Sequence, residues 1–284
     1  MVLILGDGIR FIDISTHVIA FRRDGGLRRP PIIFLHTLGG DMMQWVVSDV
    51  YKDLVGRGLE VYAVDLDGHG FSGRNPYDEE FMKIERLASS IASFVERAGV
   101  EKPVLVGISL GGSVAILARA LLKERALGAL ALAPMVRGDP DRFSKLASLW
   151  ERVSDPEEAI EIMANTLKHS TPGIEEKEIY RYLVERIAWR FHFRVDLVKT
   201  IASFYRYNQD INLAEIVGDL SNKMVTIIGC DRDPLVSQED LERFSRSTGA
   251  TLKIFRGCGH MLIYEKPGEI VDEILSIIDR GRAL

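Results

Sequence analysis

Short apolar segments alternate along this chain with longer segments of helical periodicity. The apolar segments, each a predicted strand, are Ile32–His36, Leu59–Leu66, Val104–Gly107, Leu127–Pro134, Met224–Gly229 and Thr251–Phe255. The predicted helices are Met42–Val55, Phe81–Arg97, Gly112–Lys123, Gln238–Ser247 and Pro267–Asp279. Strands that are apolar on both faces and alternate with helices are typical of a parallel sheet covered by helices on both sides. Residues 1–22 predict short strands around Gly6-Asp7-Gly8, at an antiparallel edge of that sheet.

The alternation stops between residues 136 and 213. This segment begins with the turn-like Gly138-Asp139-Pro140, is charged and mostly helical, and has no clear buried strand. We therefore expect a helical cap at residues 137–213, inserted into a core made of residues 1–136 and 214–284. One run within the cap alternates at period two, which predicts either a strand or a helix buried on more than one side. Its residues are Trp189, Phe191, Phe193, Val195 and Leu197.

The composition excludes several classes of partner. Of the 284 residues, 46% are hydrophobic and 27% are charged, which is typical of a globular protein with a sizeable core. The net charge of −5 and the lack of a basic stripe argue against a nucleic-acid partner. The apolar run Met1–Leu5 is too short for a signal peptide, and no stretch is long enough to span a membrane. The expected location is therefore the cytoplasm.

The two cysteines, Cys230 and Cys258, close two neighbouring predicted strands. Two cysteines are too few for a disulfide framework. A disulfide there would brace the loops that follow the strands, but in a reducing cytoplasm we expect two buried free thiols instead.

The sequence Gly107-Ile108-Ser109-Leu110-Gly111 joins a predicted strand to a predicted helix. A G-x-S-x-G pattern in that context predicts a nucleophile elbow, where a strained turn pushes the serine hydroxyl out of the sheet. The glycines let strand and helix approach each other without a clash of Cβ atoms. Ser109 is therefore the candidate nucleophile, although the bare pattern also occurs in ordinary turns.

A serine hydroxyl needs a general base, and the base needs an acid that orients it. His260 is the candidate base because it follows the last predicted strand on a glycine-rich loop, although an exposed loop histidine is the alternative. The acid should lie between the serine and the histidine, after an intervening strand, where Asp231 and Asp233 both occur. We prefer Asp233, because it lies further onto the loop and Pro234 fixes the turn after it.

Hydrolysis through a tetrahedral intermediate also requires an oxyanion hole. The N–H of Leu110, directly after the serine, is one expected donor. The second should come from the loop after the Ile32–His36 strand, where Leu38 is the candidate and two glycines follow it. We expect His36 to hydrogen-bond the backbone of this loop rather than to transfer protons.

Four motifs in this order resemble the α/β-hydrolase superfamily, in particular its capped branch of esterases, lipases and carbon–carbon bond hydrolases. They are the His36 loop, the segment Asp65–Ser72, the serine elbow, and Gly259-His260 followed by Glu265 and Pro267. The resemblance implies a mostly parallel eight-stranded sheet with helices on both faces and a cap after the sixth core strand. It also implies a Ser109–Asp233–His260 triad that works without a metal or an organic cofactor.

The chain departs from this family at two positions. Thr37 stands where the family usually has glycine, and Asp67 stands where an arginine is common. We expect the motif around Asp67 to be structural and to hold its loop beside the elbow. Ser109 argues against a haloalkane dehalogenase or an epoxide hydrolase. The members of those two classes that resemble this family have an aspartate, not a serine, at the position of the nucleophile.

The substrate must be recognised by the cap, whose sequence is less informative. Met42, Trp189 and Met261 are the candidate substrate contacts, and other aromatic cap residues are expected to pack between cap and core. Arg186, Arg190 and Arg194 recur every four residues. They either attract an acidic substrate or form a solvated helix face, and we favour the solvated face.

The resemblance and the candidate triad together predict a serine hydrolase that cleaves a carboxylic ester of a small or medium apolar substrate through an acyl-enzyme. A carbon–carbon bond hydrolase, a lactonase or a thioesterase with the same triad is the alternative, and a non-catalytic ligand-binding protein is a third possibility. Fold alone does not choose a substrate, and the sequence is silent on oligomeric state.

Overall fold

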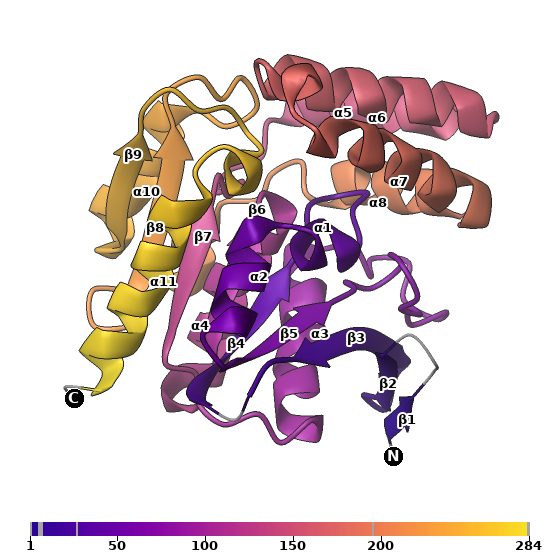
Figure 1. Ribbon diagram of the computed structural model, residues 1–284. Helices are drawn as coiled ribbons and strands as arrows, with labels where there is room; N and C mark the ends of the chain where they lie inside the picture. Colours follow the sequence, from indigo (N-terminus) through magenta and orange to yellow (C-terminus); the bar gives the residue numbers. More distant parts are fainter. Residues whose placement is uncertain (1, 5–7, 27, 195, 283–284) are drawn as a thin grey trace.

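One twisted sheet runs through the middle of the protein. The computed structural model describes residues 2–4, 8–26, 28–194 and 196–282 (Figure 1). Nine strands within these residues pair in the order β1-β2-β3-β5-β4-β6-β7-β8-β9. They are β1 (Val2–Ile4), β2 (Ile9–Asp13), β3 (Val18–Asp24), β4 (Arg28–Leu35), β5 (Leu59–Val64), β6 (Val104–Ile108), β7 (Gly128–Leu132), β8 (Val225–Cys230) and β9 (Thr251–Phe255).

The sheet is antiparallel at one edge and parallel elsewhere. The pairs β1–β2, β2–β3 and β3–β5 are antiparallel, and every pair from β5 through β4 to β9 is parallel. This confirms the predicted fold class, with the short β1 added at the antiparallel edge to the eight strands expected. Gly6 and Asp7 of the predicted N-terminal turn lie outside the described residues, as do Met1 and Leu5.

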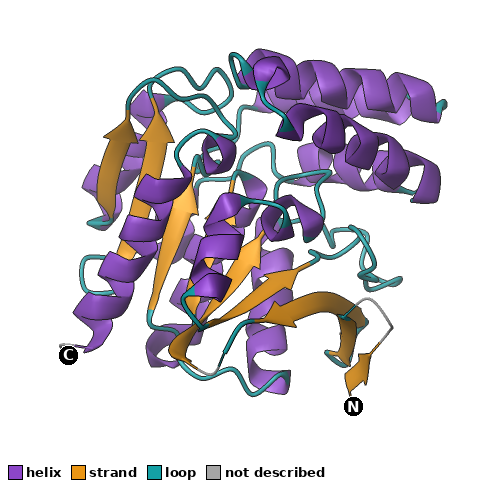
Figure 2. Ribbon diagram, viewed as in Figure 1, coloured by secondary structure: helices purple, strands orange, loops and turns teal. Residues whose placement is uncertain are grey.

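Helices cover both faces of the sheet (Figure 2). The helices α2 (Asp49–Gly56) and α11 (Pro267–Arg282) pack on one face. The other face is covered by α3 (Ile84–Arg97), α4 (Leu110–Leu122), α9 (Leu213–Val217) and α10 (Gln238–Thr248). Successive side chains of a strand point to opposite faces. In β4, Ile33 and Leu35 join one core and Ile32 and Phe34 the other, which explains why the strands read as continuous apolar runs.

The segment between β7 and β8 contributes four further long helices. They are α5 (Pro140–Arg152), α6 (Pro156–Ser170), α7 (Ile179–Phe193) and α8 (Leu197–Tyr207), and they form a layer above α1, at the upper right of Figure 1. Asp139 and Asp155 cap the first two of these helices by accepting backbone N–H groups, and a proline follows each cap. A carboxylate cap followed by proline is a strong signal for a helix start.

For one predicted element the structure decides between two alternatives in favour of a helix, and a second predicted element differs from the structure. The run 189–197 is helical on both sides of Val195, which itself lies outside the described residues, so its period-two pattern did not indicate a strand. The predicted helix Met42–Val55 is two helices, α1 (Met43–Val46) and α2, because extended Ser48 interrupts it. The Ser48 hydroxyl donates to the carbonyl of Trp45 and accepts the N–H of Tyr51, which ends one helix and caps the next.

None of the helices in the described ranges combines the length and the apolar character that crossing a membrane requires.

Candidate active site

Ser109 occupies a strained turn between β6 and α4. Its backbone has φ 55° and ψ −120°, a conformation that typically costs a non-glycine residue about 1–3 kcal/mol. The Ser109 N–H donates to the carbonyl of Leu132 over 2.8 Å, which ties the turn to β7. A Cβ atom at Gly107 would overlap the carbonyl oxygen of Gly111, and one at Gly111 would overlap that of Leu35. Both glycines of the elbow pattern are therefore required by close backbone approach.

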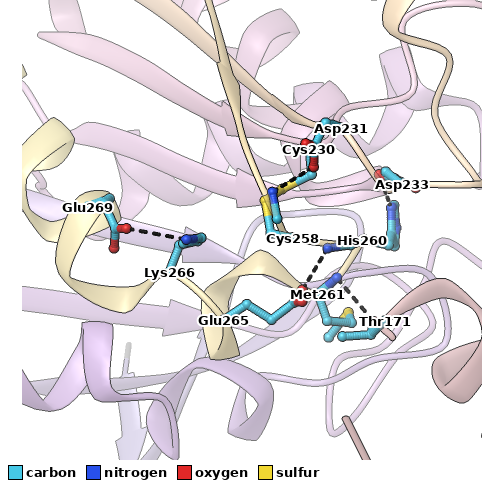
Figure 3. The surroundings of a disulfide bond; sticks show 12 residues. Thr171, Cys230, Asp231, Asp233, Cys258, His260, Met261, Glu265, Lys266 and Glu269 are labelled. Carbon is cyan, nitrogen blue, oxygen red and sulfur yellow. Dashed lines mark hydrogen bonds and ion pairs between the residues drawn. A yellow bond between two sulfur atoms is a disulfide. The ribbon is translucent and has the colours of Figure 1, made fainter. Parts of the chain in front are cut away.

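Asp233 and His260 meet above the carboxyl ends of β8 and β9 (Figure 3). His260 Nδ1 lies 2.8 Å from Asp233 Oδ2, and both side chains are buried. The other carboxylate oxygen of Asp233 accepts the N–H groups of Leu235, at 2.8 Å, and Val236, at 3.3 Å. These bonds orient the carboxylate, which in turn holds Nδ1–H of the imidazole and leaves Nε2 as its basic atom.

Asp231, the alternative acid, has a different partner. Its carboxylate accepts the N–H of Gly257 over 2.7 Å and so links the loops that follow β8 and β9. The structure thus brings Asp233 rather than Asp231 to His260, as we preferred from the sequence.

Cys230 and Cys258 form a disulfide, with Cα atoms 5.4 Å apart (Figure 3). The expectation of two free thiols was therefore wrong. Cys230 pairs with Phe255 in the ladder between β8 and β9, and the turn through Gly257 returns the chain to Cys230. The disulfide joins the starts of the two loops that carry Asp233 and His260.

The end of α6 also holds the His260 loop. The N–H of His260 donates to the carbonyl of Ser170 over 2.7 Å, and the N–H of Met261 donates to the hydroxyl of Thr171 over 3.3 Å. The helical layer therefore positions the imidazole through the backbone.

The residues that carry the two expected oxyanion donors line the same cavity as the serine and the histidine. The cavity has a volume of about 450 Å³, and its lining includes Leu38, Ser109, Leu110 and His260. Leu110 is the first residue of α4, so its N–H has no partner within the helix. Among the described residues, no acceptor for the Leu38 N–H is found. Both N–H groups are thus available to a ligand oxygen.

Two buried histidines fix the loop that carries Leu38. His36 accepts the N–H of Leu66 at Nε2, over 3.0 Å, and His69 accepts the N–H of Gly39 at Nε2, over 3.1 Å. Each Nδ1 lies within 2.9 Å of a backbone carbonyl, so both rings are neutral and carry their proton on Nδ1. Burial lowers the pKa of each to about 3. The expectation that His36 bonds the loop backbone is confirmed.

Gln44 hydrogen-bonds Thr37, which stands where the α/β-hydrolase family usually has glycine. The N–H of Thr37 donates to Gln44 Oε1 over 2.9 Å, and Gln44 Nε2 donates to the Thr37 hydroxyl over 3.2 Å. On the neighbouring loop, the Asp65 carboxylate accepts the N–H groups of Met42 and Phe71. The segment Asp65–Ser72 therefore holds the oxyanion loop, which is the structural role expected for it.

Only one of the three expected substrate contacts lines the cavity. Met261 does, beside His260. Met42 instead packs into the core beneath the loop, at 1% exposure, and Trp189 stacks on Phe193 with ring centroids 4.7 Å apart. The expectation is corrected for Met42, which precedes α1 and is buried in the core, and for Trp189, whose ring on α7 packs against Phe71 and Phe193 outside the cavity.

Two arginines that we expected on a solvated face line the cavity instead. Arg186 forms an ion pair with Asp41, and Arg190 Nη1 lies 3.9 Å from the same carboxylate. Arg194 is also engaged, because its guanidinium donates to carbonyls of the loop 68–72. Sequence reasoning missed Asp41 and the two cavity arginines as a group. A signal did exist, because helical spacing puts Arg190 on the buried face of α7 with Leu183, Ile187 and Phe191.

No group of three or more histidine, cysteine, aspartate or glutamate side chains in the described ranges is arranged to hold a metal ion.

The chain is similar in sequence to hydrolases. A family model described as "Alpha/beta hydrolase family" matches residues 32–273. A Mycoplasma pneumoniae protein with the provisional name esterase/lipase 2 is 24% identical over 257 residues, which cover 89% of this chain and 90% of that protein. Lipase LipV of Mycobacterium tuberculosis is 25% identical over 225 residues, covering 77% of this chain and 83% of the lipase.

Solved structures share the fold. The enol-lactonase of Burkholderia xenovorans LB400 superposes with a TM-score of 0.78 at 16% identity, over 95% of this chain and 99% of the other. A thermophilic esterase from Thermogutta terrifontis superposes with a TM-score of 0.75 at 18% identity, over 95% and 98% of the two chains.

Proposed function

The chain belongs to the alpha/beta hydrolase family, and on that premise we propose that it cleaves carboxylic esters of small or medium size through a covalent acyl-enzyme. One observation carries the proposal. Ser109, on a strained strand-to-helix turn, lines the same cavity as His260, whose Nδ1 is bonded to Asp233. A serine, an imidazole and a buried carboxylate that holds the imidazole are the parts that acyl transfer needs.

The proposed reaction has two halves. Ser109 Oγ attacks the ester carbonyl carbon while His260 Nε2 takes the hydroxyl proton, and the carbonyl becomes an oxyanion that accepts the N–H groups of Leu38 and Leu110. The carbon–oxygen bond to the alcohol then breaks, and His260 returns the proton to the departing alkoxide. A water molecule repeats the sequence on the acyl-enzyme, which releases the acid and restores the serine.

The helices between β7 and β8 support an apolar substrate body. We propose residues 137–213 as a cap over the core formed by residues 1–136 and 214–284. A cavity of about 450 Å³ suits a small or medium ligand. The apolar lining that the cap segment contributes includes Phe143, Leu146, Leu149, Trp150, Ile162 and Met163. An acyl chain or an aromatic alcohol packed there would place its carbonyl at the serine.

Hydrolysis of p-nitrophenyl esters of increasing acyl length tests this function. We expect turnover that peaks at one chain length and falls to the uncatalysed rate in Ser109→Ala, with the thermal midpoint retained. Ser89→Ala is the matched control, because Ser89 is exposed on α3 and its hydroxyl donates to the carbonyl of Glu85, one turn earlier in the same helix. Ester hydrolysis that survives in folded Ser109→Ala would refute the nucleophile. No turnover of any ester by the folded wild type would direct the assay to lactones, thioesters and vinylogous diketones.

A further inference from the structure

Two arginines project from one face of α7 into the wall of the cavity. Arg186 and Arg190 are one helical turn apart, and both belong to its lining. Arg190 is 8% exposed, and the guanidinium of Arg186 lies 4.2 Å from the ring centroid of Trp189. Their shared counter-ion is Asp41, a buried residue three positions after Leu38. The two arginines therefore lie on the side of the cavity formed by the oxyanion loop.

Asp41 does not provide hydrogen-bond acceptors for the guanidinium of Arg190. One oxygen of Asp41 pairs with Arg186, and the other accepts the N–H of Met43 over 3.0 Å. Arg190 Nη1 is 3.9 Å from Asp41, which is beyond hydrogen-bonding distance. The Nε atoms of Arg186 and Arg190 are buried and have no acceptor within the described part of the chain. A guanidinium offers five N–H donors, so burying it with so few acceptors is unfavourable unless a ligand supplies them.

The lining of the cavity is rich in arginine. It contains four arginines and three aspartates, namely Arg137, Arg142, Arg186 and Arg190 with Asp41, Asp139 and Asp240. Burial and the charge of Asp41 raise the pKa of the nearby Asp65 to about 7, which weakens its contribution as a counter-charge. Burial lowers the pKa of Arg190, Asp41 opposes this, and Arg186 lowers it further, as expected for a cation short of anions. Arg190 is therefore a buried cation whose nearest carboxylate lies beyond hydrogen-bonding distance, and a carboxylate on a ligand would neutralise it.

We propose that Arg190, with Arg186, binds a carboxylate group of the substrate, so that this hydrolase prefers esters that carry a free carboxylate over neutral esters of the same size. The preference rests on the proposed function, since it concerns the substrate of the same site. A planar carboxylate matches the forked guanidinium and supplies acceptors that Asp41 does not. The remaining apolar body of such a substrate would pack against the apolar cap helices.

Matched pairs of esters test the preference in the wild type. One pair carries the charge on the alcohol, 4-acetoxybenzoate against methyl 4-acetoxybenzoate. The other carries it on the acyl group, the mono-4-nitrophenyl ester of adipate against 4-nitrophenyl hexanoate. We expect the anionic member of at least one pair to have a kcat/KM about 10- to 100-fold higher, mostly through KM, as for a charge-assisted hydrogen bond.

Variants in α7 test whether the preference for the anionic ester depends on Arg190. In Arg190→Met the ratio of kcat/KM between the anionic and the neutral ester should fall toward one, and Arg190→Lys should keep part of the preference. Arg181→Gln is the matched control, because Arg181 is on the same helix but exposed and paired with Glu185. If Arg190→Met does not fold, two measurements still test the carboxylate preference. One is the ester comparison in the wild type, and the other is the same comparison in Arg186→Met, whose substitution is at a less buried position.

A binding measurement separates this inference from the proposed function. Calorimetric titration of adipate and of benzoate into Ser109→Ala needs no turnover. We expect at least one to bind, and its Kd to rise about 10- to 100-fold when Arg190→Met is added. If the carboxylate binds in this way but the wild type hydrolyses no ester, the carboxylate site is supported and the esterase function is refuted. Equal turnover of anionic and neutral esters, with no effect of Arg190→Met and no carboxylate binding, would overturn the carboxylate site and leave the esterase standing.

Discussion

The disulfide between Cys230 and Cys258 should stabilise the fold measurably. The cysteines are separated by 28 residues, and loop-closure entropy for a loop of that length corresponds to about 3.5 kcal/mol at 25 °C. For a chain of this size each kcal/mol moves the thermal midpoint by about 2 °C. Reduction, or the double variant Cys230→Ala/Cys258→Ala, should therefore lower the Tm by about 7 °C.

The same change should reduce activity more than substrate affinity. The ladder between β8 and β9 does not depend on the disulfide, so the sheet should persist. The loops carrying Asp233 and His260 lose a shared anchor, and small displacements of reacting groups reduce rates strongly. We expect kcat to fall by about tenfold, with a smaller change in KM.

Circular dichroism melts and ester kinetics, with and without a phosphine reductant, measure both effects. The double variant is the control, since reductant should not change its Tm or its kcat. Full reduction, verified by mass spectrometry, that leaves both Tm and kcat unaltered would refute the bracing role. Two free thiols in protein purified without reductant and denatured before titration would refute the disulfide itself.

Two further predictions concern charge at the site. Asp233→Asn should lower kcat about 10³- to 10⁴-fold, because the amide no longer stabilises the imidazolium of His260, whereas Asp231→Asn should have little effect; equal losses in the two variants would contradict the assignment. Since burial lowers the pKa of His36 and His69 from 6.5 to about 3, the unfolded chain binds more protons between those pH values. The free energy of unfolding should then be largest above pH 6.5 and fall as pH drops toward 3, by up to about 1.4 kcal/mol per pH unit for each histidine. Urea unfolding from pH 7 to pH 4 measures this slope, and constant stability over the range would contradict the neutral histidines.

The strands and most helices were predictable because their signals are local. A strand covered by helices on both sides must be apolar at every position, so β6 and β7 could be located from a few residues each. The division of Met42–Val55 into two helices was not predictable, because it depends on the Ser48 hydroxyl donating a hydrogen bond to the carbonyl of Trp45 rather than to water.

The candidate triad was also predictable from local patterns. Gly107 is required by a backbone contact with Gly111 within the same turn. The loops after β8 and β9 place Asp233 and His260 at the same edge of the sheet because those strands are parallel neighbours. The disulfide was not predictable in the same way. The assumed reducing compartment, rather than the strand order, decided that expectation, whereas the register of β8 and β9 brings the two cysteines together.

The sequence by itself therefore determined the layered sheet, the order of its elements and the serine turn, because each depends on residues close together in the chain. Only the tertiary structure decided what lines the cavity. Periodicity indicates which face of α7 is buried, but not that this face meets the oxyanion loop, where Asp41 lies 145 residues from Arg186. It likewise does not indicate that Met42 and Trp189 lie outside the cavity. Contacts between segments so far apart depend on how the helices dock on the sheet, and docking is a property of the whole packed surface rather than of any one segment.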